Sequence, residues 1–218
     1  MRDDDGNTNS ITCECFENIR VLSNIRRSGL EKMIDKYKMD TFVCKIDWQK
    51  KIKENADRYI VKRSHDWFFI GGQVGSGKTH ICVAICHELM KLGCELKYLS
   101  WRDYLNDLKS SFNRVDANIS DKQKEYKEIE VLFIDDLFKS GYEKKPTTWE
   151  LEMLSELIDF RYKNGLITII SSELSVPDIV DIDESIGSRI FEKTSEFAID
   201  IHKDKNKNVR FMKGLSQL

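Results

Sequence analysis

A glycine-rich loop directly after an apolar stretch constrains this chain more than any other feature of its sequence. Residues 67–70 read WFFI, and residues 72–79 read GQVGSGKT, which fits the pattern G-x-x-x-x-G-K-[ST] at every position. Glycines let backbone N–H groups converge on phosphate oxygens without a clashing Cβ, and the following helix points its positive end at the same phosphates. The order of strand, loop and helix therefore predicts a site for a nucleoside triphosphate.

The residue types in the loop assign its contacts. Lys78 is expected to reach the β- and γ-phosphates, and Thr79 is expected to bind Mg²⁺. The predicted ligands are ATP or ADP with Mg²⁺. The residues predicted to contact the nucleotide are Gly72, Gln73, Val74, Gly75, Ser76, Gly77, Lys78, Thr79 and His80.

Short apolar strands alternate with helical patterns through most of the chain. This alternation is typical of an α/β fold with a parallel sheet covered by helices on both faces. The expected strands are residues 67–70, 95–100, 131–134, 166–171 and 196–201. The expected helices are residues 47–59, 78–92, 101–112 and 148–163, with short helices within 176–193. Residues 113–128 are charged and poor in apolar side chains, which predicts a surface excursion.

Two carboxylates follow the apolar strand at residues 131–134. At the carboxyl end of a parallel strand they are expected beside the phosphate loop. Asp135 is predicted to hold Mg²⁺, and Asp136 to polarise the attacking water as a catalytic residue. The commoner pair is Asp-Glu, and aspartate is one methylene shorter, so slow or partner-dependent hydrolysis is expected. The alternative for Asp136 is a simple turn residue.

Two later segments add candidate catalytic residues. The strand at residues 166–171 runs into polar residues, of which Ser171, Ser172 and Glu173 are all placed to sense the γ-phosphate, and Ser172 is the predicted catalytic one. Arg189 follows near a helix end, where it is predicted to neutralise charge on the ATP of a neighbouring subunit. By spacing alone, an ordinary surface arginine is the favoured interpretation.

The N-terminal region has its own pattern. Residues 1–12 are polar and acidic, which predicts disorder, and residues 14–38 carry an apolar helical stripe that Ser28 and Gly29 interrupt. This helical appendage either packs on the main domain or docks on a partner. Cys13 and Cys15 form only half of a zinc-binding set, and the four histidines are scattered, so zinc is not expected.

Charge and hydropathy limit the partners and the cellular location that can be expected for this protein. The formal net charge is −2, so no global field attracts the chain to DNA or anionic lipid, and any DNA contact needs a local patch. The apolar runs are far shorter than the roughly 20 residues that span a bilayer, and the start lacks the apolar segment of a signal peptide. We expect a cytoplasmic protein without a membrane partner.

The order of the motifs resembles the DnaC/DnaI-type replicative helicase loaders, in particular those of phages and Firmicutes. The resemblance covers about residues 40–210 and rests on five segments: residues 72–79, 132–139 (LFIDDLFK), 156–162 (ELIDFRY), 170–175 (ISSELS) and 183–190 (DESIGSRI). It implies an AAA+ P-loop ATPase core with a parallel five-stranded sheet and no C-terminal lid domain. Residues 39–218 would form that core, and residues 1–38 a short partner-docking appendage.

The same resemblance implies partners and residue roles. The partners would be the replicative hexameric helicase and single-stranded DNA, with ATP-dependent self-assembly. Arg189 falls at the arginine finger of the family, and residues 40–42 resemble the segment that passes near the adenine. The expected DNA contacts are basic residues and two aromatic residues that either stack on bases or pack inside: Lys109, Arg114, Lys144, Lys145, Trp101 and Tyr104.

Three other functions share parts of this pattern. One is a transposition helper ATPase of the IstB type, which acts on double-stranded target DNA with a transposase. Another is an adaptor that binds ATP without hydrolysing it and holds the helicase. A small-molecule kinase fits worst, because such kinases need a lid with several arginines and residues 113–128 supply only Arg114.

Overall fold

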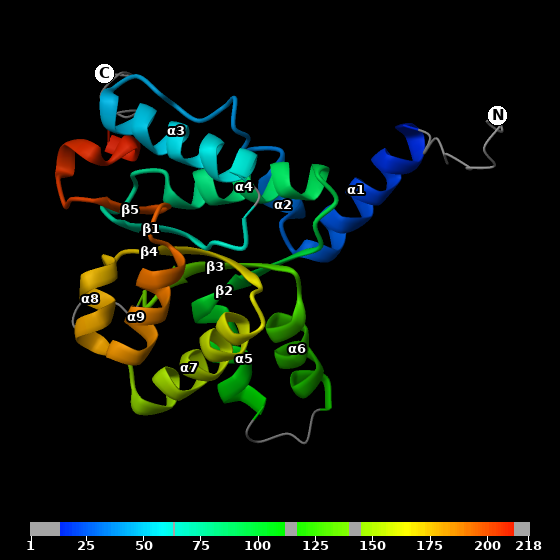
Figure 1. Ribbon diagram of the computed structural model, residues 1–218, viewed down its shortest axis with the longest axis vertical. Coiled ribbons are helices and arrows are strands. Elements are labelled where there is room, and N and C mark those ends of the chain that lie inside the picture. Colours follow the sequence, from blue (N-terminus) through cyan, green and yellow to red (C-terminus); the bar gives the residue numbers. More distant parts are fainter. Residues whose placement is uncertain (1–13, 63, 112–116, 140–144, 212–218) are drawn as a thin grey trace, which may run out of the picture.

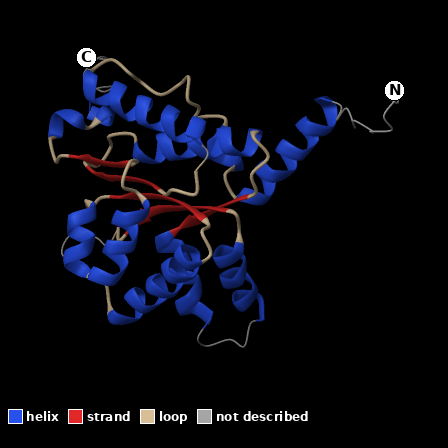
Figure 2. Ribbon diagram, viewed as in Figure 1, coloured by secondary structure: helices blue, strands red, loops and turns tan. Residues whose placement is uncertain are grey.

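A parallel sheet forms the centre of the molecule. The structure is a computed structural model that describes residues 14–62, 64–111, 117–139 and 145–211. Within these residues, five strands lie in the order β2-β3-β4-β1-β5, and all neighbours are parallel (Figures 1 and 2). The strands are β1 (Phe68–Gly72), β2 (Leu96–Ser100), β3 (Val131–Leu137), β4 (Ile167–Ser172) and β5 (Ala198–Ile201).

Helices cover both faces of the sheet, as Figure 2 shows. On one face lie α1 (Glu14–Ser28), α2 (Glu31–Ile34), α3 (Asp47–Lys62) and α4 (Lys78–Lys91). On the other face lie α5 (Trp101–Ser111), α6 (Ala117–Glu128), α7 (Thr148–Lys163), α8 (Val176–Ile182) and α9 (Glu184–Lys193). A 3₁₀ turn, η1 (Lys205–Lys207), follows β5.

The pleat of β1 separates two hydrophobic cores. Phe68 and Ile70 face the core under α3 and α4, whereas Phe69 faces the core under α5, α7 and α9. All three side chains are fully buried. Burial on both faces explains the unbroken apolar sequence of this strand, since a sheet covered on both sides has no polar face.

The predicted α/β architecture is confirmed, and one helix lies where the sequence predicted none. Residues 113–128 were expected to form a surface excursion, but α6 occupies Ala117–Glu128. Few apolar residues anchor this helix: Tyr126 packs edge-on against Tyr104 of α5, with ring centroids 5.6 Å apart. Its carbonyl end is held by a residue from α7, a contact that no local sequence pattern reveals.

Arg161 of α7 provides that contact. Its side chain is fully buried, and its Nη1 donates to the carbonyls of Tyr126, Lys127 and Ile129 at 2.8–3.2 Å. Its remaining N–H groups donate to the carbonyls of Glu130 and Ile167 and to the hydroxyl of Thr168. Burial lowers the pKa of the guanidinium to about 9, because every one of these partners is a neutral oxygen. Arg161 thus joins α7 to α6, to the two residues that link α6 to β3, and to β4.

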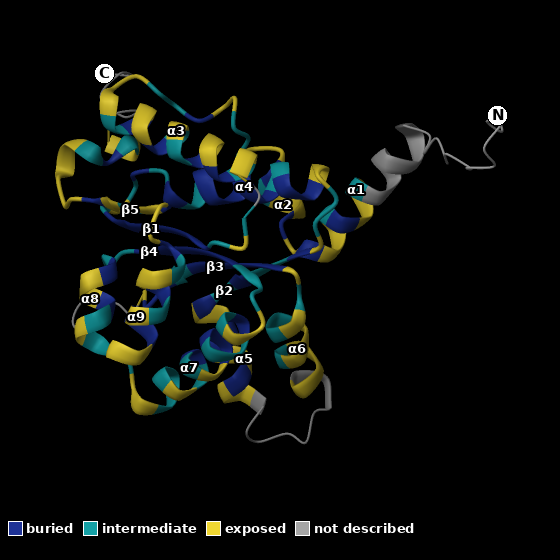
Figure 3. Cartoon of the chain, viewed as in Figure 1, coloured by how far each residue is buried: buried dark blue, intermediate teal, exposed yellow. Residues whose placement is uncertain are grey.

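The described part of the N-terminal region packs on this core. The break predicted at Ser28 and Gly29 is present, and Leu30 and Ile34 are buried in the core under α4. Contacts join α1 to β2 and α4, while the far end of α1 projects from the body of the molecule (Figure 1). The buried residues lie mainly in the sheet and on the helix faces that pack against it, as Figure 3 shows. Among the described residues, no helix has the length and apolar character needed to cross a bilayer.

We expect Arg161→Met to destabilise the fold. The substitution leaves a ring of buried carbonyls without donors, each costing on the order of 1–3 kcal/mol, so the free energy of unfolding should fall by roughly 3 kcal/mol or more. Urea denaturation followed by circular dichroism measures this change. Lys163→Met on the same helix is the control, because Lys163 is exposed and its ion pair with Asp159 lies at the surface. Equal midpoints for the two variants would contradict the role of Arg161.

Candidate functional site

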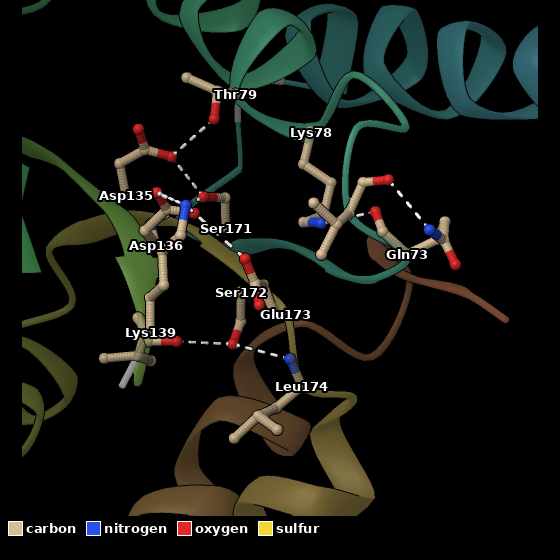
Figure 4. A network of polar contacts seen from close by, with 12 residues as sticks. Gln73, Lys78, Thr79, Asp135, Asp136, Lys139, Ser171, Ser172, Glu173 and Leu174 are labelled. Atoms are coloured by element: carbon tan, nitrogen blue, oxygen red, sulfur yellow. Dashed lines mark hydrogen bonds and ion pairs between the residues drawn. The ribbon is translucent and has the colours of Figure 1, made fainter. Parts of the chain in front are cut away.

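The candidate site lies where β1, β3 and β4 end. Because the strands are parallel, their carboxyl ends meet at one edge of the sheet, beside the N-terminus of α4 (Figure 4). A pocket of about 300 Å³ opens there. Its lining includes Gly75, Gly77, Lys78, Thr79, His80 and Asp136. The structure therefore brings most of the predicted loop residues and one predicted catalytic carboxylate together.

The glycines of the loop are required by its close neighbours. Gly72 has φ +97°, and a Cβ there would lie 2.0 Å from the carbonyl oxygen of Ile201. Gly75 has φ +73°, and a Cβ there would lie 2.2 Å from Oδ1 of Asn208. Backbone hydrogen bonds from Gln73 N to Ile201 O and from Val209 N to Gly75 O, both 2.9 Å, hold the C-terminal segment against the loop.

Lys78 extends into the mouth of the loop. Its Nζ donates to the carbonyls of Gly72 and Gln73, each at 2.8 Å, and only 7% of the residue is exposed. Burial lowers the pKa of this ammonium, and the nearby carboxylates of Glu173 and Asp136 oppose that shift. The ammonium is thus held beside the backbone N–H groups of the loop and the N-terminus of α4, an arrangement suited to phosphate oxygens.

Asp135 is the most connected side chain of the site. Its Oδ1 accepts hydrogen bonds from Thr79 of α4 at 3.0 Å and from Ser171 of β4 at 2.5 Å, and its Oδ2 accepts one from Tyr98 of β2 at 3.3 Å. Only 6% of Asp135 is exposed, and burial raises the pKa of its carboxyl. Tyr98 had no predicted role, although β2 pairs with β3 and puts this tyrosine near the end of the acidic strand.

The pair of Thr79 and Asp135 fits a magnesium ion. Mg²⁺ prefers oxygen ligands and is commonly held by one or two protein groups together with water and substrate phosphates. The hydroxyl and the carboxylate lie 3.0 Å apart at the edge of the phosphate pocket. Among the described residues no cluster of three or more His, Cys, Asp or Glu side chains could hold a metal by itself.

Asp136 lines the pocket. Its carboxylate belongs to a cluster of ion pairs with Lys139 and Glu173. Its Oδ2 lies 2.7 Å from Nζ of Lys139, and Nζ lies 3.6 Å from Oε1 of Glu173 (Figure 4). Lys139 was missed as a site residue by the sequence patterns. The left-handed backbone at Asp136 (φ 55°) lies in the irregular end of β3, and that at Phe138 (φ 58°) lies in the turn that follows the strand. Neither residue is a glycine, so the sequence does not indicate such backbone.

The three candidate sensor residues have different surroundings. Ser171 donates to Asp135 and accepts from the backbone N–H of Asp136, so it positions both carboxylates. Ser172 is fully buried, donates to the carbonyl of Leu137 and accepts from the N–H of Leu174. Glu173 is the one of the three that lines the pocket. These contacts favour Glu173 over the predicted Ser172 as a group that faces a phosphate.

Arg189 lies apart from the pocket of its own chain. It is on α9, where its Nη2 is 2.9 Å from Oδ1 of Asp159 and its Nη1 donates to the carbonyl of Ser185. About 29% of the side chain is exposed, and it is not among the residues that line the phosphate pocket. Gly187 before it is required by packing, since a Cβ there would lie 2.5 Å from Cα of Val180 in α8.

Residues 36–42 reach the other side of the pocket. His80 Nε2 lies 2.9 Å from the carbonyl of Lys38, and the His80 ring contacts Tyr37 and Phe42 with centroids 5.0 and 5.3 Å apart. Phe42 is buried and lies beside Gly77, 3.1 Å from where a Cβ would stand. Lys36 and Tyr37 line the pocket. The segment thus lies near the phosphate loop.

The remaining candidates are only partly described. Cys13, Arg114 and Lys144 lie outside the described residues, and the side chain of Cys15 does too. Lys109 pairs with Glu150 at 3.0 Å, and Lys145 lines a separate surface pocket of about 370 Å³. Trp101 and Tyr104 are 3% and 9% exposed, which favours packing over base stacking.

Comparison with known proteins identifies the family. Residues 18–189 match the family described as IstB-like ATP binding protein. The chain is 32% identical over 208 residues to the uncharacterized protein YqaM of Bacillus subtilis (strain 168), covering 91% of this chain and 65% of that protein. It is 38% identical over 133 residues to the phage-like element PBSX protein XkdC of the same strain, covering 60% of this chain and 48% of that protein. The chain thus spans about half to two thirds of these relatives.

Solved structures share the fold. The crystal structure of the DnaC helicase loader superposes with a TM-score of 0.63 at 22% identity, covering 79% of this chain and 99% of that one. The crystal structure of DnaI gives a TM-score of 0.62 at 20% identity, covering 80% and 95%. The predicted AAA+ core is therefore confirmed, and the described residues after β5 hold no helical lid domain. The chain belongs to the family of IstB-like ATP binding proteins.

We expect Asp135→Asn to stabilise the nucleotide-free protein. Because burial raises the pKa of Asp135, the stability linked to this carboxyl is present below its unfolded pKa and is lost as the pH rises through its folded pKa. Asparagine removes the buried charge and keeps an acceptor for Thr79 and Ser171. Relief of about 1 kcal/mol would raise Tm by roughly 2–4 °C at neutral pH.

Thermal denaturation measures this gain, which should shrink as the pH is lowered through the raised pKa of the Asp135 carboxyl, because the carboxylate itself then takes up a proton. The same variant should lose the Mg²⁺-dependent part of the Tm increase that ATP produces. Asp107→Asn on α5 is the control, because Asp107 is an exposed carboxylate paired only loosely with Lys122. If Asp135→Asn lowered Tm instead of raising it, the buried charge of Asp135 would not be the source of instability that we infer.

Proposed function

We propose that this IstB/DnaC-like AAA+ protein hydrolyses ATP and loads a replicative hexameric helicase on single-stranded DNA. One observation carries the ATPase part: Lys78 and Thr79 at the start of α4 meet Asp135 and Asp136 of β3 at one edge of the sheet. The loader part is supported by the fold, since 99% of the DnaC helicase loader chain and 95% of the DnaI chain superpose on it.

Each residue has a role in hydrolysis that follows from its position. Lys78 and the N–H groups of the loop would neutralise the charge on the phosphates. Thr79 and Asp135 would hold Mg²⁺, which neutralises phosphate charge and polarises the phosphoryl group. The carboxylate of Asp136 would orient the attacking water and take up its proton. Since Lys139 occupies one oxygen of Asp136, turnover by the isolated chain is expected to be slow.

Two alternatives are each favoured by one observation. A transposition helper is favoured by the family match itself, because the matching family is described as IstB-like. A non-hydrolysing adaptor is favoured by the ion pair at Asp136, which withholds the predicted water-orienting group. The identity of the bound partner distinguishes a transposition helper from a helicase loader. ATP turnover distinguishes a non-hydrolysing adaptor from a loader.

The test is a pull-down of the tagged full chain from its native lysate with Mg·ATP, with bound proteins identified by mass spectrometry. We expect a replicative helicase to be retained by the unaltered chain. It should be lost with Lys78→Ala, because this variant lacks the phosphate-binding ammonium. ATP turnover with and without single-stranded DNA is then measured on the purified complex. Recovery of a transposase, or of no helicase, would contradict the loader function.

We further expect Arg189→Ala to spare ATP binding and to reduce turnover in the assembled protein by about a thousandfold, since an arginine supplied by a neighbouring subunit stabilises the transition-state charge. Calorimetry measures the binding, and phosphate release measures the turnover. Lys193→Ala, one helical turn further along α9, is the control, because Lys193 also lies over the Tyr162 ring.

A mixing experiment sharpens the test of Arg189. Lys78→Ala subunits lack a working pocket but carry Arg189, whereas Arg189→Ala subunits carry the intact pocket. In an equal mixture, about a quarter of the interfaces of a ring would join an intact pocket to an intact arginine, so partial turnover should return. If the mixture stays as inactive as the two separate variants, Arg189 does not act across subunits.

A further inference from the structure

The turn after β3 places a second lysine in the phosphate pocket. Asp136 and Phe138 both have left-handed backbone, and the N–H of Lys139 closes the turn on the carbonyl of Asp136 at 3.0 Å. Left-handed backbone is costly for side chains of this size and persists only where the surroundings enforce it. Phe138 supplies that enforcement, because its ring is 8% exposed and packs in the core under α5 and α7.

The ammonium of Lys139 lies between two carboxylates. Its Nζ is 2.7 Å from Oδ2 of Asp136 and 3.6 Å from Oε1 of Glu173. Burial would lower the pKa of this ammonium, but the hydrogen bond and the charge of Asp136 and Glu173 outweigh it, so the net pKa is raised and the group stays charged at neutral pH. About 43% of the side chain is exposed, which leaves it free to change partner.

Lys139 shares the pocket with the groups that would surround the phosphates. Lys78, Thr79, Asp136, Lys139 and Glu173 all line it. Lys78 is fixed by two loop carbonyls, whereas the contacts of the Lys139 ammonium with described residues are to the side-chain carboxylates of Asp136 and Glu173. The terminal phosphate of ATP carries more negative charge than either carboxylate, and ADP lacks this phosphate. Lys139 is therefore positioned to respond to ATP and not to ADP.

We propose that Lys139 distinguishes ATP from ADP by exchanging its ion pair with Asp136 and Glu173 for one with the terminal phosphate. The exchange frees the Oδ2 oxygen of Asp136 to orient the attacking water, so Lys139 is a positioning residue for Asp136. This inference rests on the proposed ATP-dependent function and adds a group that senses the nucleotide state. Loss of Lys139 should weaken binding of the triphosphate and leave binding of the diphosphate nearly unchanged.

The test compares the affinities of the full chain for Mg·AMPPNP, a non-hydrolysable ATP analogue, and for Mg·ADP by calorimetry. We expect Lys139→Met to reduce the preference for AMPPNP over ADP by about tenfold, the effect of removing one charge-assisted hydrogen bond. Lys139→Arg should restore most of the preference. Lys36→Met is the matched control: Lys36 also lines the pocket but lies over the Tyr37 ring, so its loss should affect both nucleotides equally.

A double-mutant cycle tests whether Lys139 leaves its carboxylate partners when the triphosphate binds. Glu173→Gln should raise the preference for AMPPNP, because it removes one partner that competes for the ammonium. In the Lys139→Met background the same substitution should have a smaller effect, since its action passes through Lys139. A Tm close to that of the unaltered chain shows that each variant is folded.

The outcomes separate this inference from the proposed function. An unchanged AMPPNP/ADP preference in Lys139→Met would overturn the role of Lys139, whatever partner the pull-down recovers. An equal loss of affinity for both nucleotides would also overturn it, because it would assign Lys139 a purely structural role. Failure of the unaltered chain to bind either nucleotide would overturn both proposals, whereas absence of a helicase partner alone would affect only the loader function.

Discussion

The carboxylate of Asp135 is the interaction on which the rest of the site depends. It receives hydrogen bonds from α4, from β4 and from β2, and so it joins three elements that are far apart in the sequence. Ser171 extends the connection, since its hydroxyl donates to Asp135 and accepts from the backbone N–H of Asp136. The parallel register makes this possible, because it aligns the strand ends at one edge. A displacement of β4 would therefore move both carboxylates relative to the phosphate loop.

The shape of the phosphate loop is equally dependent on distant residues. The segment after β5 lies along the loop: the N–H of Gln73 donates to Ile201, the side chain of Gln73 accepts from the N–H of Asp204, and the N–H of Val209 donates to Gly75. Gly72 and Gly75 are needed because atoms of this segment lie too close to where a Cβ would stand. The glycines of the motif thus serve contacts with the protein itself as well as the approach to a phosphate.

The N-terminal helices are continuous with the pocket. The chain leaves α2, which is buried on the core through Ile34, and within a few residues reaches the pocket at Tyr37. His80 then joins this segment to the first turn of α4 through the carbonyl of Lys38. The predicted alternatives for the appendage, packing or docking, are consequently not exclusive in physical terms. Its inner part packs on the core and contacts the pocket, while the far end of α1 projects outward (Figure 1).

The sequence predicted what local patterns encode and missed what depends on tertiary contacts. Periodicity and the glycine motif predicted the strands, the phosphate loop and the acidic strand end, because each has a local cause. The helix α6 was missed because Arg161, 33 residues beyond its end, holds its last carbonyls. Lys139 was missed because its turn needs left-handed backbone at two non-glycine residues, which the packing of Phe138 enforces. The sequence attributed slow hydrolysis only to the short side chain of Asp136. In the structure Lys139, three residues further along the chain, also pairs with this carboxylate. That ion pair can be recognised only once the turn after β3 is known.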